Sequence, residues 1–260
     1  MAESREVTAI ERIWPDPGVP SLDELREDYA RTWPAVSEGS GAMMISSLDG
    51  SAVLGAVSGG LSSPADQKLM DVQRSVVDAV VIGAGTLREE GYGGLRVAED
   101  SVAWRRSRGM TDHPVLVVVS RSLDLDPASA FLVEAPVRPL ILTGAAASPR
   151  RREALQEVAG VEVLDDGAGG VDAQAAHELF ARRGWQRIHS EGGPSVLAVW
   201  LSAGRIAELH LSLSPVLAGP TEAGLLGASI DPQRLELSQV LRDGSMLLTR
   251  YRVRAAAQRP

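Results

Sequence analysis

The sequence has no cysteine, a single lysine (Lys68) and few aromatic residues, which make up 4% of its 260 positions. Without thiols the chain can form neither a disulfide framework nor a thiolate nucleophile, and it cannot bind zinc or an iron–sulfur cluster through sulfur. Because every basic residue other than Lys68 is arginine, a bound phosphate must be held by guanidinium, hydroxyl or backbone N–H groups.

Long apolar runs are also missing: none approaches the roughly 18 residues of a membrane span. Residues 1–10 lack the basic and apolar regions of a secretory signal. Acidic side chains outnumber basic ones by 34 to 26, and the net charge of -8 argues against a nucleic-acid or anionic-membrane surface. The histidines show neither metal-ligand spacing nor a G-x-S-x-G partner. We therefore expect a cytoplasmic protein without bound metal.

Short apolar runs alternate with helical stretches along most of the chain. Several runs are apolar throughout, as in strands covered on both faces, and the alternation predicts an α/β fold with a mainly parallel central sheet flanked by helices. Strands are expected at 42–46, 79–83, 115–120, 140–143, 161–164, 187–190, 208–214, 235–241 and 245–254. Asp243-Gly244 would turn the last two into an antiparallel hairpin. The 208–214 strand alternates leucine with polar residues and is expected to bury one face only.

The proline-rich start predicts an N-terminal extension over residues 1–40, followed by one catalytic domain over residues 41–260. Within the extension, Ser21 and Glu24 have the spacing of a capping box at a helix start. In the main domain, Ser63 and Pro64 start a second helix. Its apolar stripe leaves Arg74 on the opposite face, so the pattern alone places Arg74 in solvent.

Three segments have the residue types of a ligand site. The turn Gly83-Ala84-Gly85-Thr86 and the segment Glu191-Gly192-Gly193-Pro194-Ser195 follow predicted strands, and their backbone N–H groups suit phosphate oxygens. The first turn fails the dinucleotide fingerprint, because Arg88 stands where the third glycine belongs. Asp49 ends an inner strand, where α/β folds bind ligands. The arginine groups at 105–108 and 150–152 are interpreted as solvated faces.

Together these segments resemble the pyrimidine reductase of riboflavin biosynthesis, the RibD C-terminal domain family, which has a dihydrofolate-reductase-like fold. The resemblance covers residues 41–254 and rests on segments 43–50, 58–66, 78–86, 191–194 and 208–219, in the same order. The histidine and paired-cysteine motif of a preceding zinc deaminase is absent, so the resemblance is to a stand-alone reductase. It implies a homodimer that reduces 5-amino-6-(5-phosphoribosylamino)uracil to the ribitylamino product, by hydride transfer from NADPH to ribose C1′.

The resemblance also implies roles for individual residues. Asp49 and Glu191 are the candidate catalytic carboxylates, and the sequence does not choose between them. Substrate contacts are expected from Ser47, Ser58, Arg74, Arg96 and Glu191. Cofactor contacts are expected from Gly60, Gly83, Gly85, Thr86, Glu90, Ser120, Arg121, Gly192, Gly193 and Ser195. Arg121 is the candidate for the 2′-phosphate that distinguishes NADPH from NADH.

Two other functions stay open on the sequence. A dihydrofolate or pterin reductase of the same fold would use an acid such as Asp49 to protonate a ring nitrogen, but it would have no use for phosphate-binding arginines such as Arg74 and Arg96. A non-catalytic NADPH-binding paralogue would keep the glycine turns alone. For the homodimer, the 209–213 strand and the C-terminal hairpin are the expected apolar edge.

Overall fold

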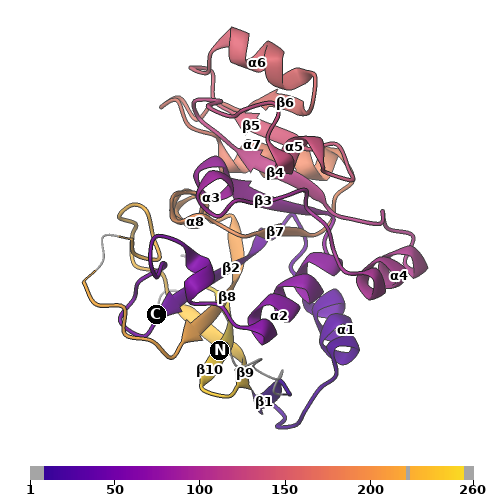
Figure 1. Cartoon of the computed structure of the whole chain (residues 1–260), viewed down its shortest axis with the longest axis vertical. Coiled ribbons are helices and arrows are strands. Elements are labelled where there is room, and N and C mark those ends of the chain that lie inside the picture. Colours follow the sequence, from indigo (N-terminus) through magenta and orange to yellow (C-terminus); the bar gives the residue numbers. More distant parts are fainter. Residues whose placement is uncertain (1–8, 221–222, 255–260) are drawn as a thin grey trace, which may run out of the picture.

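The fold of the computed structural model, which describes residues 9–220 and 223–254, is built on one ten-stranded sheet (Figure 1). The strands are β1 (Glu11–Trp14), β2 (Ser40–Ser47), β3 (Ala79–Gly83), β4 (Val115–Val119), β5 (Leu140–Thr143), β6 (Gly160–Val163), β7 (Ile188–Ser190), β8 (Ile206–Ser214), β9 (Leu235–Asp243) and β10 (Met246–Val253). Their order in space is β1-β9-β10-β8-β2-β7-β3-β4-β5-β6. From β8 to β6 all neighbours are parallel, whereas β1, β9 and β10 join by antiparallel pairs. The predicted fold class is confirmed.

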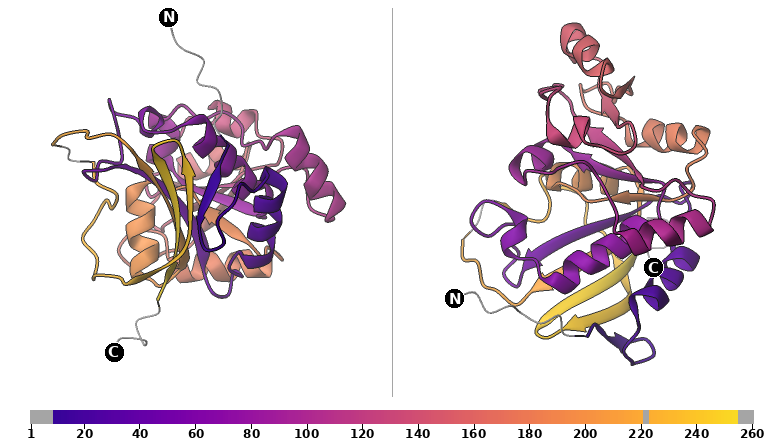
Figure 2. Two further views of the ribbon diagram at one scale, coloured as in Figure 1. Left: turned by 90° about the horizontal axis from the view of Figure 1, so that it is seen from below. Right: turned by 45° about the vertical axis from the view of Figure 1, so that its right-hand side comes forward.

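Helices cover both faces of the sheet (Figure 2). They are α1 (Leu22–Thr32), α2 (Pro64–Ser75), α3 (Ala84–Glu89), α4 (Glu99–Ser107), α5 (Ala130–Val133), α6 (Pro149–Gln156), α7 (Ala173–Arg182) and α8 (Pro194–Ser202), with a 3-10 turn η1 (Ser58–Gly60). Val80 and Ile82 of β3 join the apolar cluster that includes α1 and α2, while Val81 joins the cluster of α7 and α8. None of the helices in the described part of the chain is long and apolar enough to cross a bilayer.

Local sequence signals agree with the observed helix starts. Ser21 and Glu24 form the predicted capping box of α1, and the Ser63 hydroxyl accepts a hydrogen bond from the N–H of Asp66 at the start of α2. Each predicted strand is present, with its ends shifted by no more than a few residues. These features depend on neighbours in sequence, which is why the sequence predicts them well.

The expectation that β8 buries only its leucine face is wrong. His210, Ser212 and Ser214 are fully buried, whereas Leu211 and Leu213 are half-buried. Buried polar side chains are tolerated when they have partners, and Ser212 and His210 on this face of β8 have them. Ser212 Oγ donates to Asp66 Oδ1 at 2.6 Å, and the ring of His210 contacts Gln73 Nε2 at 3.1 Å. The strand also lies inside the sheet, between β10 and β2, so it offers no edge to a second copy.

The N-terminal segment shares the core of the rest of the chain. β1 pairs with β9 at one edge of the sheet, and α1 packs against α2. Leu25, Tyr29 and Trp33 are buried in the same apolar cluster as α2 and β3. Residues 11–33 are thus packed onto the sheet, and the division between residues 40 and 41 stays a prediction.

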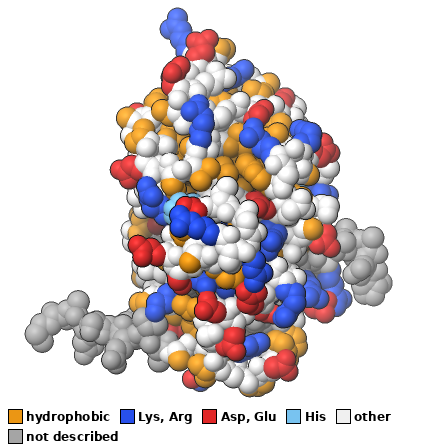
Figure 3. Space-filling view, turned by 90° about the vertical axis from the view of Figure 1, so that its right-hand side faces the viewer, with side chains coloured by type: hydrophobic (Ala, Val, Ile, Leu, Met, Phe, Trp, Pro, Cys, Tyr) orange, Lys and Arg blue, Asp and Glu red, His pale blue; other side chains and the backbone are white. Residues whose placement is uncertain are grey.

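The arginine group at 105–108 is only partly the solvated face that the sequence suggests. Arg105 is fully buried and donates to the carbonyls of Ser75 and Val77 at 3.0 and 2.6 Å, so it ties α4 to the end of α2. Arg106 and Arg108 form ion pairs at the surface with Asp112 and Glu27. On the face shown in Figure 3, Lys and Arg side chains are interleaved with Asp and Glu.

Candidate active site

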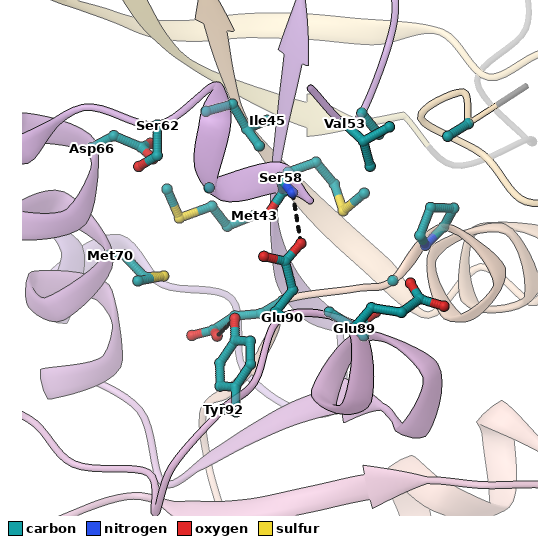
Figure 4. A pocket seen from close by; sticks show the side chains of 18 of the residues that line it. Met43, Ile45, Val53, Ser58, Ser62, Asp66, Met70, Glu89, Glu90 and Tyr92 are labelled. Carbon is teal, nitrogen blue, oxygen red and sulfur yellow. Dashed lines mark hydrogen bonds between the residues drawn. The ribbon is translucent and has the colours of Figure 1, made fainter. Parts of the chain in front are cut away.

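A cavity of about 300 Å³ opens at the carboxyl ends of the adjacent parallel strands β2, β7 and β3 (Figure 4). This is the edge where open α/β sheets bind ligands. The lining residues come from β2, the segment after it, η1, the first half of α2 and the residues before it, α3 and the segment after it, the turn after β7, and the loop between β8 and β9. They are Met43, Met44, Ile45, Ala52, Val53, Ser58, Gly59, Ser62, Asp66, Gln67, Met70, Thr86, Glu89, Glu90, Tyr92, Glu191, Gly193, Pro194 and Ala223. Apolar walls and a few carboxylates therefore surround the space.

Glu191, which lines the cavity, forms an ion pair with Arg74, which lies outside the lining. Arg74 Nε and Nη2 donate to the two carboxylate oxygens of Glu191 at 2.5 and 2.6 Å, a bidentate arrangement. The side chains of Arg74 and Glu191 are only 13% and 4% exposed. The pattern-based interpretation that Arg74 faces solvent is wrong: the helix pattern could not show that β7 brings a buried carboxylate to this face of α2.

The pair fixes the charge of Glu191. Burial alone would raise the pKa of this carboxyl, but the charge and hydrogen bonds of Arg74 lower it below its ordinary value. Tyr92 adds a hydroxyl that donates to Glu191 Oε2 at 3.5 Å. Burial, together with the charge of Glu191, raises the pKa of the Tyr92 phenol, so the hydroxyl keeps its proton. Glu191 is therefore an anion and a poor proton donor.

Asp66 is a second buried carboxyl in the lining, and it has a different environment. Its oxygens accept from the hydroxyls of Ser62 and Ser212, both at 2.6 Å, and no ion pair is formed with it among the described residues. Burial raises its pKa, and the two hydrogen bonds only partly offset this effect. Figure 4 shows Asp66 beside Ser62 at one side of the cavity. Asp66 can thus hold a proton at a higher pH than an ordinary aspartate.

Asp49 lies outside the cavity lining and holds a loop. Its carboxylate accepts from the Ser47 hydroxyl at 2.5 Å and from the backbone N–H groups of Ala218 and Gly219 at 3.0 and 2.7 Å. The hydrogen bond from Ser47 and those two N–H groups lower the pKa of Asp49 to about 2. A carboxyl group with that pKa is ionised near neutral pH, so it has almost no proton to donate. Ser47 also accepts from the N–H of Ser51, so it braces the turn that Asp49 begins.

The glycine turns after β3 and β7 meet each other. Gly83 N–H donates to Gly192 O at 2.8 Å, and a Cβ at Gly193 would lie 2.3 Å from Thr86 Oγ1. The Gly192–Gly193 peptide is cis, and Gly192 has φ of 87°. Gly193 is the N-cap of α8 and has no side-chain cap, so the N–H groups of the first turn of α8 lack a side-chain partner.

The other predicted contact residues are divided between the cavity and the surface. Ser58 lines the cavity, and its N–H donates to Glu90 Oε1 at 2.7 Å (Figure 4). Arg96 is exposed and donates to the carbonyl of Glu134, so it does not reach the cavity. Gly60, Gly85, Ser120, Arg121 and Ser195 also lie outside the lining. Arg121 and Ser195 are exposed, and Ser120 is buried at the end of β4.

Sequence reasoning missed several lining residues. The sequence analysis assigns no functional role to Asp66, Met43, Met70 or Tyr92, although Met43 and Asp66 lie in segments that carry the resemblance. The signal available for Tyr92 was its position between Gly91 and Gly93 in a chain with few aromatics. The methionines have no such signal, because apolar side chains on β2 and α2 are equally typical of core.

Comparisons with known proteins identify the family of the chain. The model of the RibD C-terminal domain family matches residues 42–249. The 2,5-diamino-6-ribosylamino-4(3H)-pyrimidinone 5′-phosphate reductase of Methanothermobacter thermautotrophicus is 28% identical over 216 residues, which is 80% of this chain and 94% of that protein. The reductase of the same name from Archaeoglobus fulgidus is 25% identical over 162 residues, 61% of this chain and 71% of that protein.

Solved structures show the same architecture. A pyrimidine reductase-like protein from Corynebacterium diphtheriae is 30% identical and superposes with a TM-score of 0.77, covering 84% of this chain and 92% of that one. The riboflavin biosynthesis reductase Rib7 of Saccharomyces cerevisiae shares the fold with a TM-score of 0.65 at 14% identity, over 90% of this chain and 97% of that one. With the family match spanning most of its length, the chain belongs to the RibD C-terminal domain family, an oxidoreductase family with the dihydrofolate-reductase-like fold.

Proposed function

We propose that this chain reduces a ribosylamino-pyrimidine 5′-phosphate of riboflavin biosynthesis to the ribitylamino compound. The observation that supports this most is the buried Arg74–Glu191 pair, two predicted substrate residues from distant segments that meet at one cavity. Relatives matched over most of their length are named as reductases of such a compound. The stand-alone relatives are named for the diamino-pyrimidinone, whereas the sequence-based hypothesis names the deaminated uracil, so both are candidate substrates.

NADPH is the proposed hydride donor, and the residues present fit a dinucleotide. The close approach of Gly193 to Thr86 leaves no room for a Cβ, and the uncapped start of α8 offers N–H groups to phosphate oxygens. Arg121 is exposed, and its guanidinium has no hydrogen bond or ion pair within the described residues. A free guanidinium suits the 2′-phosphate of NADPH. The cofactor supplies the hydride, and the protein aligns the two ligands.

For the proton that must accompany the hydride, the geometry favours Asp66 over Asp49 and Glu191. Glu191 is paired with Arg74, and the pKa of Asp49 is lowered to about 2. Asp66 has a raised pKa and contacts Ser62, whose hydroxyl also lines the cavity. We propose that Asp66 passes a proton through Ser62 to the nitrogen of the open-chain imine, while Glu191 orients the substrate.

One observation favours a second candidate, a dihydropterin reductase. The described lining carries four carboxylates (Asp66, Glu89, Glu90 and Glu191) and no Lys, Arg or His, and Arg74 is already paired with Glu191. Such a lining suits ring N–H and amino donors, whereas a ribose phosphate would have to draw Arg74 from Glu191 or turn Arg96 inward. The functions thus differ in whether the 5′-phosphate contributes to binding.

A homodimer and a cytoplasmic location complete the proposal. Exposed apolar residues, Ile13 and Trp14 of the edge strand β1 and Leu235 and Leu237 of its neighbour β9, give a candidate dimer surface. The strand β9 belongs to the C-terminal hairpin that the sequence analysis included in the expected apolar edge, whereas β8 lies inside the sheet. Light scattering at micromolar concentration tests the dimer, and a monomeric mass would contradict it. The cytoplasmic location stays a prediction.

The test of function is NADPH oxidation followed at 340 nm with purified protein. The substrates compared are the diamino-pyrimidinone and uracil forms of the ribosylamino phosphate, the uracil form without its phosphate, and dihydrofolate. Turnover of either phosphorylated form, lost on Arg74→Ala, supports the pyrimidine reductase. Turnover of dihydrofolate alone would move the assignment to the second candidate. Tight NADPH binding without any turnover would favour a non-catalytic binder.

A further inference from the structure

Tyr92 is the only aromatic side chain among the described residues that line the cavity. It lies after α3, half-buried, at the base of the cavity in Figure 4. Its ring lies beside the Arg74 guanidinium, with Cζ 6.0 Å from the ring centroid. We propose that Tyr92 is a specificity-determining residue, whose ring is the surface on which a flat heterocycle of the substrate stacks. This inference rests on the proposed reduction of a pyrimidine or a pterin.

The segment that carries Tyr92 is held from several sides, so the ring has a fixed place. The Tyr92 N–H donates to the carbonyl of Leu87 at 3.3 Å, and Gly91 before it adopts φ of 65°. A Cβ at Gly94 would lie 2.3 Å from the carbonyl oxygen of Glu134, so this backbone packs directly on the end of α5. A pre-positioned aromatic surface loses little entropy when a ligand binds.

The other walls complete a slot for a flat ring. Met43 and Met70 line the same cavity as Tyr92, and in Figure 4 Met43 lies above Tyr92 and Met70 lies to the left. Thioethers pack favourably against aromatic rings and adapt to the shape of a ligand. Carboxylates in the lining, such as Glu90, can accept from ring N–H and amino groups. A flat, nitrogen-rich heterocycle matches both features, whereas a sugar or an aliphatic chain would leave the Tyr92 face unused.

Three variants separate stacking from other roles. Tyr92→Phe keeps the ring and removes the hydroxyl, Tyr92→Leu removes the ring, and Tyr251→Leu is a matched change on β10, away from the cavity. Stacking of a base on an aromatic side chain corresponds to a loss of about 5- to 150-fold in affinity when the ring is removed. The probes are the ribitylamino-pyrimidine phosphate product, which takes no further hydride, and tetrahydrofolate, each titrated by calorimetry.

We expect Tyr92→Leu to weaken binding of the probe that the wild type binds by that factor and to raise KM more than it lowers kcat. Tyr251→Leu should bind within about twofold of the wild type, and Tyr92→Phe, which keeps the ring but loses the contact with Glu191, should retain most of the affinity that Tyr92→Leu loses. Equal affinity of Tyr92→Leu and wild type would overturn the inference while leaving the proposed function intact. A loss in Tyr92→Phe as large as that predicted for removal of the ring would also overturn it, and this variant serves if Tyr92→Leu does not fold. Failure of the wild type to bind either probe would instead contradict the proposed function.

Discussion

Removing Arg74 while keeping Glu191 tests the ion pair that borders the cavity. Arg74→Met keeps most of the side-chain volume but leaves a carboxylate that is 4% exposed without its bidentate partner. Breaking a buried pair on one side costs about 3–5 kcal/mol, because the remaining charge is desolvated and unpaired. We expect this loss in the free energy of unfolding at pH 7, measured by urea denaturation. The double variant Arg74→Met/Glu191→Gln should recover most of it, since no uncompensated charge remains.

The free energy of unfolding should depend on pH in opposite ways in the wild type and in Arg74→Met. In the wild type, Arg74 lowers the folded-state pKa of Glu191, so the pair stabilises the protein above the unfolded-state pKa, and this stabilisation is lost on acidification. In Arg74→Met, burial dominates and raises that pKa. The folded state then binds the extra proton, and the penalty should shrink as the pH falls from 7 toward 5.

The chain contains a second ion pair of the same geometry that is exposed, and it serves as the control for the effect of burial. Arg106 makes the same bidentate contact with Asp112, at 2.7 and 2.6 Å, but that pair is exposed at the surface. Exposed pairs are screened by water and contribute little, so Arg106→Met should lose far less stability than Arg74→Met. Equal losses in the two variants, or an Arg74→Met variant as stable as the wild type, would refute the reasoning.

Three further predictions follow from single contacts. Gly193→Ala should lower the free energy of unfolding by about 1–3 kcal/mol, because its Cβ would lie 2.3 Å from Thr86 Oγ1, whereas Gly18→Ala meets nothing within 4 Å and should melt as the wild type does. Burial lowers the pKa of His189 to about 3, so below pH 6.5 the unfolded state binds a proton that the folded state does not, and the free energy of unfolding falls. In His189→Leu, the fall in the free energy of unfolding between pH 7 and pH 5 should be smaller by about 2 kcal/mol. The same fall in the variant and the wild type would contradict this. Asp66→Asn should lower kcat by about 100-fold or more and abolish the alkaline limb of its pH profile, while NADPH affinity measured by calorimetry stays the same.

Local signals in the sequence determined the secondary structure and the family. The caps at Ser21 and Ser63 start helices because a hydroxyl satisfies N–H groups of its own first turn, which needs no tertiary contact. The inner strands follow from apolar runs, and the glycines at 83, 192 and 193 mark turns that meet in space. Since segments in the same order carry the resemblance, the sequence also predicted the RibD C-terminal domain family, which the comparisons confirm.

Tertiary structure alone decided the charge and the direction of the functional side chains. The helix pattern places Arg74 on the polar face of α2. Only the position of β7 between β2 and β3 in the sheet brings Glu191 against the Arg74 side chain. Asp49 and Asp66 are the same residue type, yet hydrogen bonds from the Ser47 hydroxyl and from backbone N–H groups lower the pKa of Asp49, and burial raises the pKa of Asp66. A pKa depends on solvation and on neighbours distant in sequence. For the same reason, the sequence could not show that Tyr92 lines the cavity or that Arg96 faces away from it.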